Sequence, residues 1–408
     1  MIRREQWSWA LYDWANSAWA TTVLVGLFPI FFNQYWATGV APATRTFYLG
    51  AIGNSVPALI VVLLAPVLGV MADRRGLKKR FLAVTTLLGA GATAALFWVP
   101  AGAWGWALAL FALSGVGFFC GLGFYDSLLL NVAAAPERDR VSAFGYGLGY
   151  LGGGLLFLVN VQMVLQPAWF GLESAAEATR WAFLSVAVWW LLFSLPLFWR
   201  VPERRESRGE ALGWRGLLAT LAKVRRNRPV LLFLLAYWLY IDAVGTVANM
   251  AVDFGLKLGF ASDALIKALL IVQFVSFPAA LAFGWLAGRI GARGGIYLAI
   301  AVYCGITVWA LFMRTEAQFY QMAAAVGLVQ GGIQALSRSY YAQLIPPEQA
   351  GEYYGFYNML GKFAAILGPL VVGLTAALTG DARLSLFVLI FFFLGGALLL
   401  SRVPAPLR

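Results

Sequence analysis

Long apolar runs make up most of this chain, and they alternate with short clusters of polar and charged residues. A helix needs about 20 apolar residues to cross the hydrocarbon core of a bilayer. The pattern predicts twelve transmembrane helices, at residues 8–36, 47–72, 81–100, 104–134, 141–165, 179–201, 229–254, 263–288, 294–313, 317–344, 352–379 and 384–401. We therefore expect an all-α membrane protein.

One long polar stretch, at residues 202–228, divides these helices into two groups of six. It predicts an N-terminal six-helix bundle at 1–201 and a C-terminal six-helix bundle at 229–408. Within the stretch, apolar residues recur at helical spacing beside basic ones: Trp214, Leu217, Leu218, Leu221 and Val224. This pattern is typical of an amphipathic helix on the cytoplasmic leaflet. It is equally typical of a solvated linker whose charges only set topology.

The amino-acid composition limits the kinds of catalytic and metal site that the chain can form. Hydrophobic residues make up 61% of the chain and charged residues only 12%, about half the charged fraction of a soluble domain. The chain has no histidine, which excludes Ser-His-Asp triads and imidazole zinc sites. Cys120 and Cys304 lie far apart in apolar runs and indicate neither a disulfide framework nor a metal motif. We therefore expect no enzyme activity, no cofactor and no bound metal.

The net charge of +12 is mostly explained by topology. With both termini counted on one side, 22 of the thirty Lys and Arg residues fall on that side and 6 on the other, while Arg338 and Lys362 lie inside spans. Because basic residues gather in cytoplasmic loops, we expect both termini in the cytoplasm and no nucleic-acid partner. The first apolar run continues to Trp36, too long for a signal-peptide core. We expect a multi-pass protein of the bacterial cytoplasmic membrane.

A weak internal repeat relates the two groups of helices. The loop after the second predicted helix begins Gly69-Val-Met-Ala72-Asp73-Arg74-Arg75-Gly76, and the loop after the eighth reads Gly284-Trp-Leu-Ala287-Gly288-Arg289-Ile-Gly291. The segment Pro136-Glu137-Arg138 after the fourth helix is echoed by Pro347-Glu348-Gln349 after the tenth. Such similarity indicates two pseudo-symmetric halves, as in transporters built from parallel repeats.

The loop at 69–79 resembles the signature loop of the major facilitator superfamily, and it lies in the expected place between the second and third helices. The segment Trp9-Ala-Leu-Tyr-Asp13-Trp-Ala-Asn16-Ser-Ala18 resembles one branch more specifically. That branch contains fungal vacuolar amino-acid effluxers linked to autophagy and bacterial relatives of unknown substrate. The resemblance implies the major facilitator fold, transport by alternating access, and amino acids as a candidate substrate class.

The same resemblance implies that the signature loop latches the two halves on the cytoplasmic side. Asp73 at a helix end can meet the positive N-terminus of another helix, and Arg138 or Arg140 can join it. The alternative is that the basic residues only set topology. The candidate gate residues are Gly69, Asp73, Arg74, Gly76, Lys78, Arg138 and Arg140.

Charged residues inside predicted spans are rare and usually face a cavity or a partner. Four of the five in this chain fall on the first, fourth, seventh and tenth helices, which line the central cavity in the superfamily that the chain resembles. Polar side chains at steps of three and four extend these positions into polar faces. The predicted substrate and proton cavity comprises Asp13, Asn16, Asp126, Asp242, Thr246, Asn249, Gln334, Arg338, Tyr341, Asn358 and Lys362.

The charges suggest roles for some of these residues. We expect Arg338, with Lys362, to bind a substrate carboxylate, because a guanidinium pairs with it bidentately. We expect Asp242 or Asp126 to hold a substrate ammonium or a coupling proton. Three alternatives stay open. Arg338 with one of the acids could form a buried structural ion pair, Asp13 could be an interfacial cap, and Lys362 could pair with a lipid phosphate.

The sequence thus predicts a secondary active transporter that moves a small polar or zwitterionic solute, with amino acids as candidates and protons as the coupling ion. The alternative is a lipid or lysolipid flippase of the same fold, which the apolar content and Lys362 as a headgroup contact would suit. The expected partners are a small-molecule substrate, membrane lipids and protons, and we expect a monomer.

Overall fold

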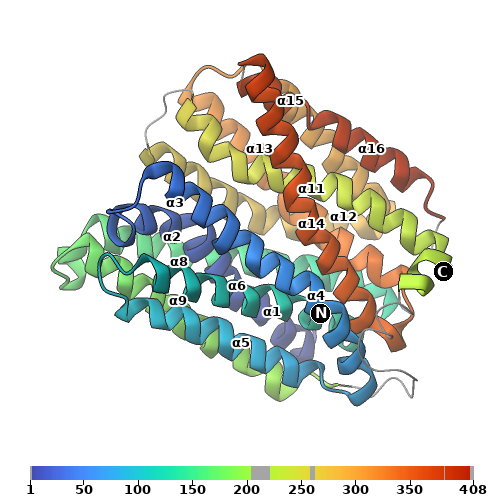
Figure 1. The fold of residues 1–408 in the computed structure, drawn as a ribbon. Coiled ribbons are helices and arrows are strands. Elements are labelled where there is room, and N and C mark those ends of the chain that lie inside the picture. The colour runs from blue at the N-terminus through green and yellow to red at the C-terminus, as the bar shows by residue number, and fades with distance from the viewer. Residues whose placement is uncertain (1, 204–220, 258–261, 381, 405–408) are drawn as a thin grey trace.

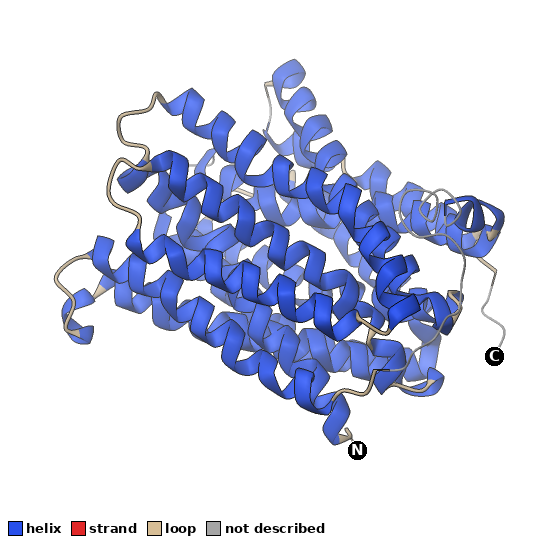
Figure 2. Cartoon of the chain, turned by 60° about the horizontal axis from the view of Figure 1, so that its bottom comes forward, coloured by secondary structure: helices blue, strands red, loops and turns tan. Residues whose placement is uncertain are grey.

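The computed structural model describes residues 2–203, 221–257, 262–380 and 382–404. Secondary structure in these ranges is helical, without strands. Figure 1 shows long helices packed side by side, those of the first half in blue to green and those of the second in yellow to red. Figure 2 shows the same layout from another direction. Most of the linker predicted at 202–228, including Trp214, Leu217 and Leu218, lies outside the described residues.

The first half contains six helical passes. Their bounds are α1 Arg4–Ala18 with η1 Trp19–Leu27, α2 Phe28–Phe31 and η2 Phe32–Trp36; α3 Pro42–Tyr48 with η3 Leu49–Ser55 and α4 Val56–Arg75; α5 Lys78–Ala95 with η4 Leu96–Trp98; α6 Trp104–Ser127 with α7 Leu129–Val132; α8 Arg138–Leu165; and α9 Ala175–Arg200. The second half comprises α11 Arg228–Lys257, α12 Ser262–Ala310, α13 Glu316–Leu344, α14 Ala350–Thr379, α15 Ala382–Phe387 and α16 Ile390–Ser401.

The long helix α12 consists of two helices joined at Gly291, whose φ of 77° lies in the left-handed region. Glycine adopts this region without steric cost because it has no Cβ. The break separates the spans predicted at 263–288 and 294–313. Within the described residues, nine helices are long and apolar enough to cross a membrane, or ten if one bent pair is a single span. That count takes α12 as one span, and the more polar α13 is not included.

The exposed surface of the bundle is apolar, which a bilayer tolerates and water does not. Trp106, Trp199 and Leu378 are each more than 70% exposed. The interior of the first half is aromatic: Trp19 stacks on Phe118 with ring centroids 4.6 Å apart. At Trp19 the first helix also changes from α-helical to π-helical geometry, a change that often marks functional sites.

Both chain ends lie at the same end of the helices in Figures 1 and 2. Hydrogen bonds connect several loops there, such as Lys79 Nζ to the Val201 carbonyl at 2.9 Å and Arg293 to the Val403 carbonyl at 2.8 Å. We call this end the terminal face. It includes residues 2–5, 73–80, 133–139, 201–203, 345–352 and 401–404.

Candidate functional site

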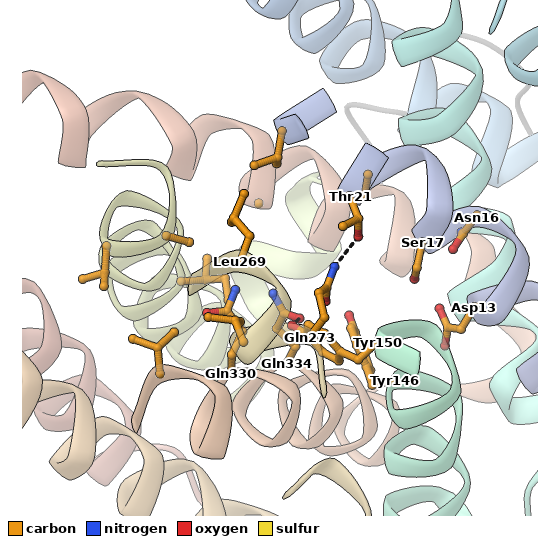
Figure 3. A pocket seen from close by; sticks show the side chains of 18 of the residues that line it. Asp13, Asn16, Ser17, Thr21, Tyr146, Tyr150, Leu269, Gln273, Gln330 and Gln334 are labelled. Carbon is orange, nitrogen blue, oxygen red and sulfur yellow. Dashed lines mark hydrogen bonds between the residues drawn. The ribbon is translucent and has the colours of Figure 1, made fainter. Parts of the chain in front are cut away.

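A cavity of about 440 Å³ lies between the two halves. This volume is typical of a small-molecule site. Figure 3 shows polar side chains of the first half, such as Asp13 and Asn16, facing glutamines of the second half, such as Gln334. Seven of the predicted cavity residues line it: Asp13, Asn16, Asp126, Gln334, Arg338, Asn358 and Lys362.

The guanidinium of Arg338 joins the two halves at the edge of this cavity. Its Nη1 donates to Asp13 Oδ2 and to Asp126 Oδ1, both at 3.2 Å, and its Nη2 donates to Asp13 Oδ2 at 3.2 Å. Its Nε donates to the Ser142 hydroxyl and its Nη2 to the Ser142 carbonyl, both at 2.9 Å. A guanidinium has five N–H groups, and these five bonds use every one of them.

Aromatic rings enclose the same guanidinium, which is only 1% exposed. Its central carbon lies 4.2 Å from the ring centroid of Tyr146 and 4.7 Å from that of Trp9. Tyr125 donates its hydroxyl to Asp13 Oδ2 at 2.7 Å. Exclusion of water strengthens such charged hydrogen bonds, so this cluster holds α1, α6, α8 and α13 together.

The side chain of Asp126 extends the cluster toward α14. Its Oδ2 accepts from the Asn358 amide at 3.2 Å, while its Oδ1 faces Arg338. Lys362 lies one helical turn beyond Asn358 and also lines the cavity. Its Nζ lies 2.9 Å from the centroid of the Phe119 ring, which is a cation–π contact.

Three of the predicted cavity residues are placed outside the lining. Asp242 accepts the backbone N–H of Gly368 at 2.8 Å, beside the Gly368-Pro369 step of α14, and Thr246 packs at the same step. Tyr341 donates to the Tyr353 carbonyl at 3.0 Å and is completely buried among other rings. Asp242 and Tyr341 thus find their partners on α14 of their own half, whereas the buried Thr246 hydroxyl has no hydrogen-bond partner among the described residues. The side chain of Asn249 lies outside the described residues.

Asp73 of the signature loop contacts the first turn of α14 in the opposite half. It accepts the backbone N–H groups of Gly351 at 2.9 Å and Glu352 at 2.7 Å. Both N–H groups lack partners within the helix, and the positive end of the helix dipole favours the carboxylate. Lys78, which is fully buried, pairs with Asp73 at 3.0 Å.

The other gate candidates lie at several positions around the terminal face. Arg138 does not meet Asp73 but donates to the Ala342 carbonyl at the end of α13, at 2.8 Å. Lys78 of the same loop is close enough to take the place beside Asp73. Gly76 ends α4 with a left-handed φ of 60°. Arg140 lies on the first turn of α8 near Gly284. The side chain of Arg74 is outside the described residues.

Glycine permits the close crossing of α4 and α14. A Cβ built on Gly351 would lie 2.8 Å from Asp73 Oδ1 and 3.1 Å from the carbonyl oxygen of Gly69. A Cβ on Gly69 would strike the carbonyl of Gly351. A side chain at either position would therefore separate Asp73 from the N–H groups that it binds.

The hydrogen bonds between the halves gather from the middle of the bundle to the terminal face. On α8 and α14, which both begin at that face, the bonding residues lie in the first half of each helix: Arg138, Asp139, Ser142, Tyr150, Gly351, Glu352 and Asn358. Gln273 donates to Thr21 near the middle of the bundle (Figure 3). The halves are therefore closed together at the terminal face.

Sequence reasoning missed several residues of the site. Ser142, Tyr146 and Tyr150 follow one another at steps of four on α8, so all three face the interface. This spacing is the signal in the sequence that points to them. Gln273 had a weaker signal, because only Ser276 lies near it at helical spacing in a largely apolar segment.

Comparison with known proteins places the chain in a family. It matches the family model described as "Vacuole effluxer Atg22 like" over residues 38–135 and 131–406. It is 38% identical over 407 residues to an uncharacterized MFS-type transporter, YxiO, of Bacillus subtilis (strain 168), covering 98% of this chain and 95% of that protein. It is 27% identical over 299 residues to autophagy-related protein 22-1 of Penicillium rubens, covering 66% of this chain and 48% of the fungal protein.

The fold agrees with solved transporters. The human organic anion transporter MFSD10 superposes with a TM-score of 0.78 at 18% identity, covering 98% of this chain and 99% of that one. The transporter FucP in the outward conformation superposes with a TM-score of 0.73 at 12% identity, covering 99% and 100%. The chain is therefore a transporter of the major facilitator superfamily and belongs to its Atg22-like family.

Proposed function

We propose that this protein moves a small polar or zwitterionic solute across its membrane by alternating access, with amino acids as the first class to test. The observation that carries the proposal is the position of the cavity. It lies between the two halves, it is lined by charged residues of both, and hydrogen bonds close it toward the terminal face. A solute held there contacts both halves at once, so their relative movement decides which side it reaches.

The closed terminal face defines the step that this conformation represents. We expect that face in the cytoplasm from its basic residues, so a solute would reach the cavity from the opposite side in this step. Release at the terminal face then requires Asp73 to leave α14 and Arg338 to leave Asp13 and Asp126. The transport cycle must therefore compensate for separating a buried arginine from two carboxylates.

Protons are the proposed compensation. Asp13 and Asp126 share one guanidinium, so the cluster carries one excess negative charge when both acids are ionised. A proton on either acid would neutralise the cluster and weaken its hold on Arg338. Asp242 is bound by the Gly368 backbone outside this cluster. We therefore assign the coupling proton to Asp126 or Asp13.

The test is transport in proteoliposomes. Vesicles that contain the wild-type protein and are loaded with one amino acid should exchange it for labelled amino acids outside. In a second assay, net uptake of an amino acid into empty vesicles should change the lumenal pH, which a pH-sensitive dye reports. Asp126→Asn should abolish the solute-dependent pH change. Asp242→Asn and the exposed-surface variant Glu173→Gln should retain it, because neither residue belongs to the cluster.

If the vesicles exchange none of the soluble solutes but move a fluorescent lysolipid across the bilayer, the flippase alternative would replace the proposal. A pH change that persists in both Asp126→Asn and Asp13→Asn would remove the proton assignment and leave the transport proposal intact.

A further inference from the structure

The two cations that line the cavity differ in what they bind. Arg338 has used all five N–H groups on Asp13, Asp126 and Ser142. A substrate carboxylate would have to displace one of these internal partners to reach it. While the terminal face is closed, Arg338 therefore offers no donor to a solute.

Lys362 is in the opposite situation. The ion pairs of the described residues include those of Arg338 and Lys78 but none of Lys362, whose ammonium contacts the face of the Phe119 ring. An ammonium has three N–H donors, and one ring face does not satisfy them all. Removing an unpaired cation from bulk water is costly, so a partly buried ammonium at a membrane cavity favours an anion beside it.

One part of the cavity wall is apolar and belongs to the same two helices as the lining glutamines Gln273, Gln330 and Gln334. It is formed by α12 and α13 through residues at helical spacing: Leu265, Leu269, Val272, Met322 and Val326. Such a wall binds hydrocarbon by burying it from water. Among the described residues, the cavity thus combines the ammonium of Lys362, which has no carboxylate partner there, with an extended apolar surface.

Resting on the transport function proposed above, we infer that the substrate is a small amphipathic organic anion whose carboxylate binds Lys362 and whose apolar body lies against α12 and α13. Arg338 instead holds the halves together. A free ammonium on the substrate is not required, because Asp13 and Asp126 already have cationic and amide partners.

Binding of three compounds with a common phenylethyl body tests this inference. They are 3-phenylpropionate (anion), L-phenylalanine (zwitterion) and 2-phenylethylamine (cation), each measured by calorimetry and by thermal shift on the purified full chain. The two carboxylates should bind and the amine should not. Lys362→Met should weaken binding at least about ten-fold, as expected for loss of a charged hydrogen bond. Lys362→Arg should retain binding, since it keeps the charge.

The matched control is Lys267→Met, because Lys267 is an exposed lysine of the same half that does not line the cavity. It should bind like wild type, and retained binding by Lys362→Arg shows that position 362 tolerates substitution. Binding of the amine as tightly as the acids, wild-type affinity in Lys362→Met, or binding of lysophosphatidylglycerol in preference to all three compounds would overturn the inference. Failure of both acids to bind would overturn it as well.

Proteoliposome exchange separates this inference from the function on which it rests. Solute exchange that is unchanged in Lys362→Met would remove the anion site and leave the transporter. Lys362-dependent binding without exchange of any solute would support the anion site and remove the proposed transport.

Discussion

The two copies of the repeated loop form similar helix crossings with different electrostatics. In the first copy, Gly69 lies against Gly351 at the start of α14; in the second, a Cβ on Gly284 would lie 2.5 Å from the Cβ of Ala143 near the start of α8. Each glycine thus meets the first turns of a helix from the opposite half. Only the first copy carries an acid there, since Gly288 stands where Asp73 does.

The difference between the two crossings separates two requirements for closing the terminal face. The steric requirement, a small residue where two helices cross, is met in both copies. The electrostatic requirement, a carboxylate on the first N–H groups of a helix, is met once. At the second crossing, Arg138 on α8 reaches the end of α13 instead. We infer that the Asp73 contact contributes most of the charge-dependent stability of the closed terminal face.

Removing the acid should have the largest effect. Asp73→Ala leaves two helix N–H groups and the buried Lys78 without their carboxylate, and breaking a buried ion pair costs about 3–5 kcal/mol. The closed state should lose its advantage, so hydrogen exchange at Gly351 and Glu352 should accelerate and transport should fall. Asp139→Ala, which removes side-chain contacts with Gln343 and Ser339 but no buried lysine partner, should change both much less. Unchanged exchange and transport in Asp73→Ala would contradict the latch.

Filling the first crossing should have the next largest effect. In Gly69→Ala the new methyl group meets the backbone of Gly351, which cannot move aside like a side chain. Overpacking of this kind costs about 1–3 kcal/mol. The closed face should again become less populated, measured by distances between spin labels on α4 and α14. The control is Gly91→Ala, where a Cβ would have no atom within 4 Å. Equal distance distributions in the two variants would remove the steric requirement.

A smaller effect is expected at the second crossing. Arg138→Gln removes a charged donor from the Ala342 carbonyl, and we expect a loss of about 1 kcal/mol because the side chain is only partly buried. Exchange of the amides around the end of α13 should rise, while Gly351 and Glu352 stay protected. Loss of protection at both places would mean that the two crossings open as one unit.

The smallest effect should come from restoring the acid in the second copy. Gly288→Asp has free space around its Cβ, and a new carboxylate that reaches the first turn of α8, as Asp73 reaches that of α14, would contribute about 0.3–1 kcal/mol. The closed face should become slightly more populated and transport slightly slower. Gly288→Asn provides the uncharged control. The electrostatic cause would be confirmed if Gly288→Asp raised the population of the closed face more than Gly288→Asn and if this difference disappeared at high salt.

The order of helices was predictable because the length of an apolar run is a local property. The spans expected at 263–288 and 294–313 correspond to the two parts of α12, separated at Gly291. The meeting of Asp73 with a helix N-terminus was also within reach of the sequence, since a carboxylate at a helix end has few suitable partners in an apolar bundle. The cation that pairs with Asp73 could not be predicted, because Lys78, Arg138 and Arg140 were all candidates for the position beside it.

The partners of the cavity charges could not be predicted. Asp13, Asp126, Ser142 and Arg338 are spread over most of the chain and come from four helices. Which of them meet depends on the rotation of each helix about its axis, and side-chain packing between helices determines that rotation. Asp242 illustrates this limit. It lies on a polar helical face in the sequence, yet in the structure it accepts the backbone N–H of Gly368 and does not line the cavity.

The sequence by itself determined that this chain is a membrane protein of two related halves, with a few charges inside the spans and a signature loop that contains one acid, Asp73. These conclusions need only the apolar content, the spacing of residues and the repeat. The tertiary structure decided that Arg338 makes its hydrogen bonds between the halves, while Lys362 lines the cavity and contacts the ring of Phe119. The reason is that a charge acts through its neighbours, and helix packing supplies those neighbours from distant parts of the chain.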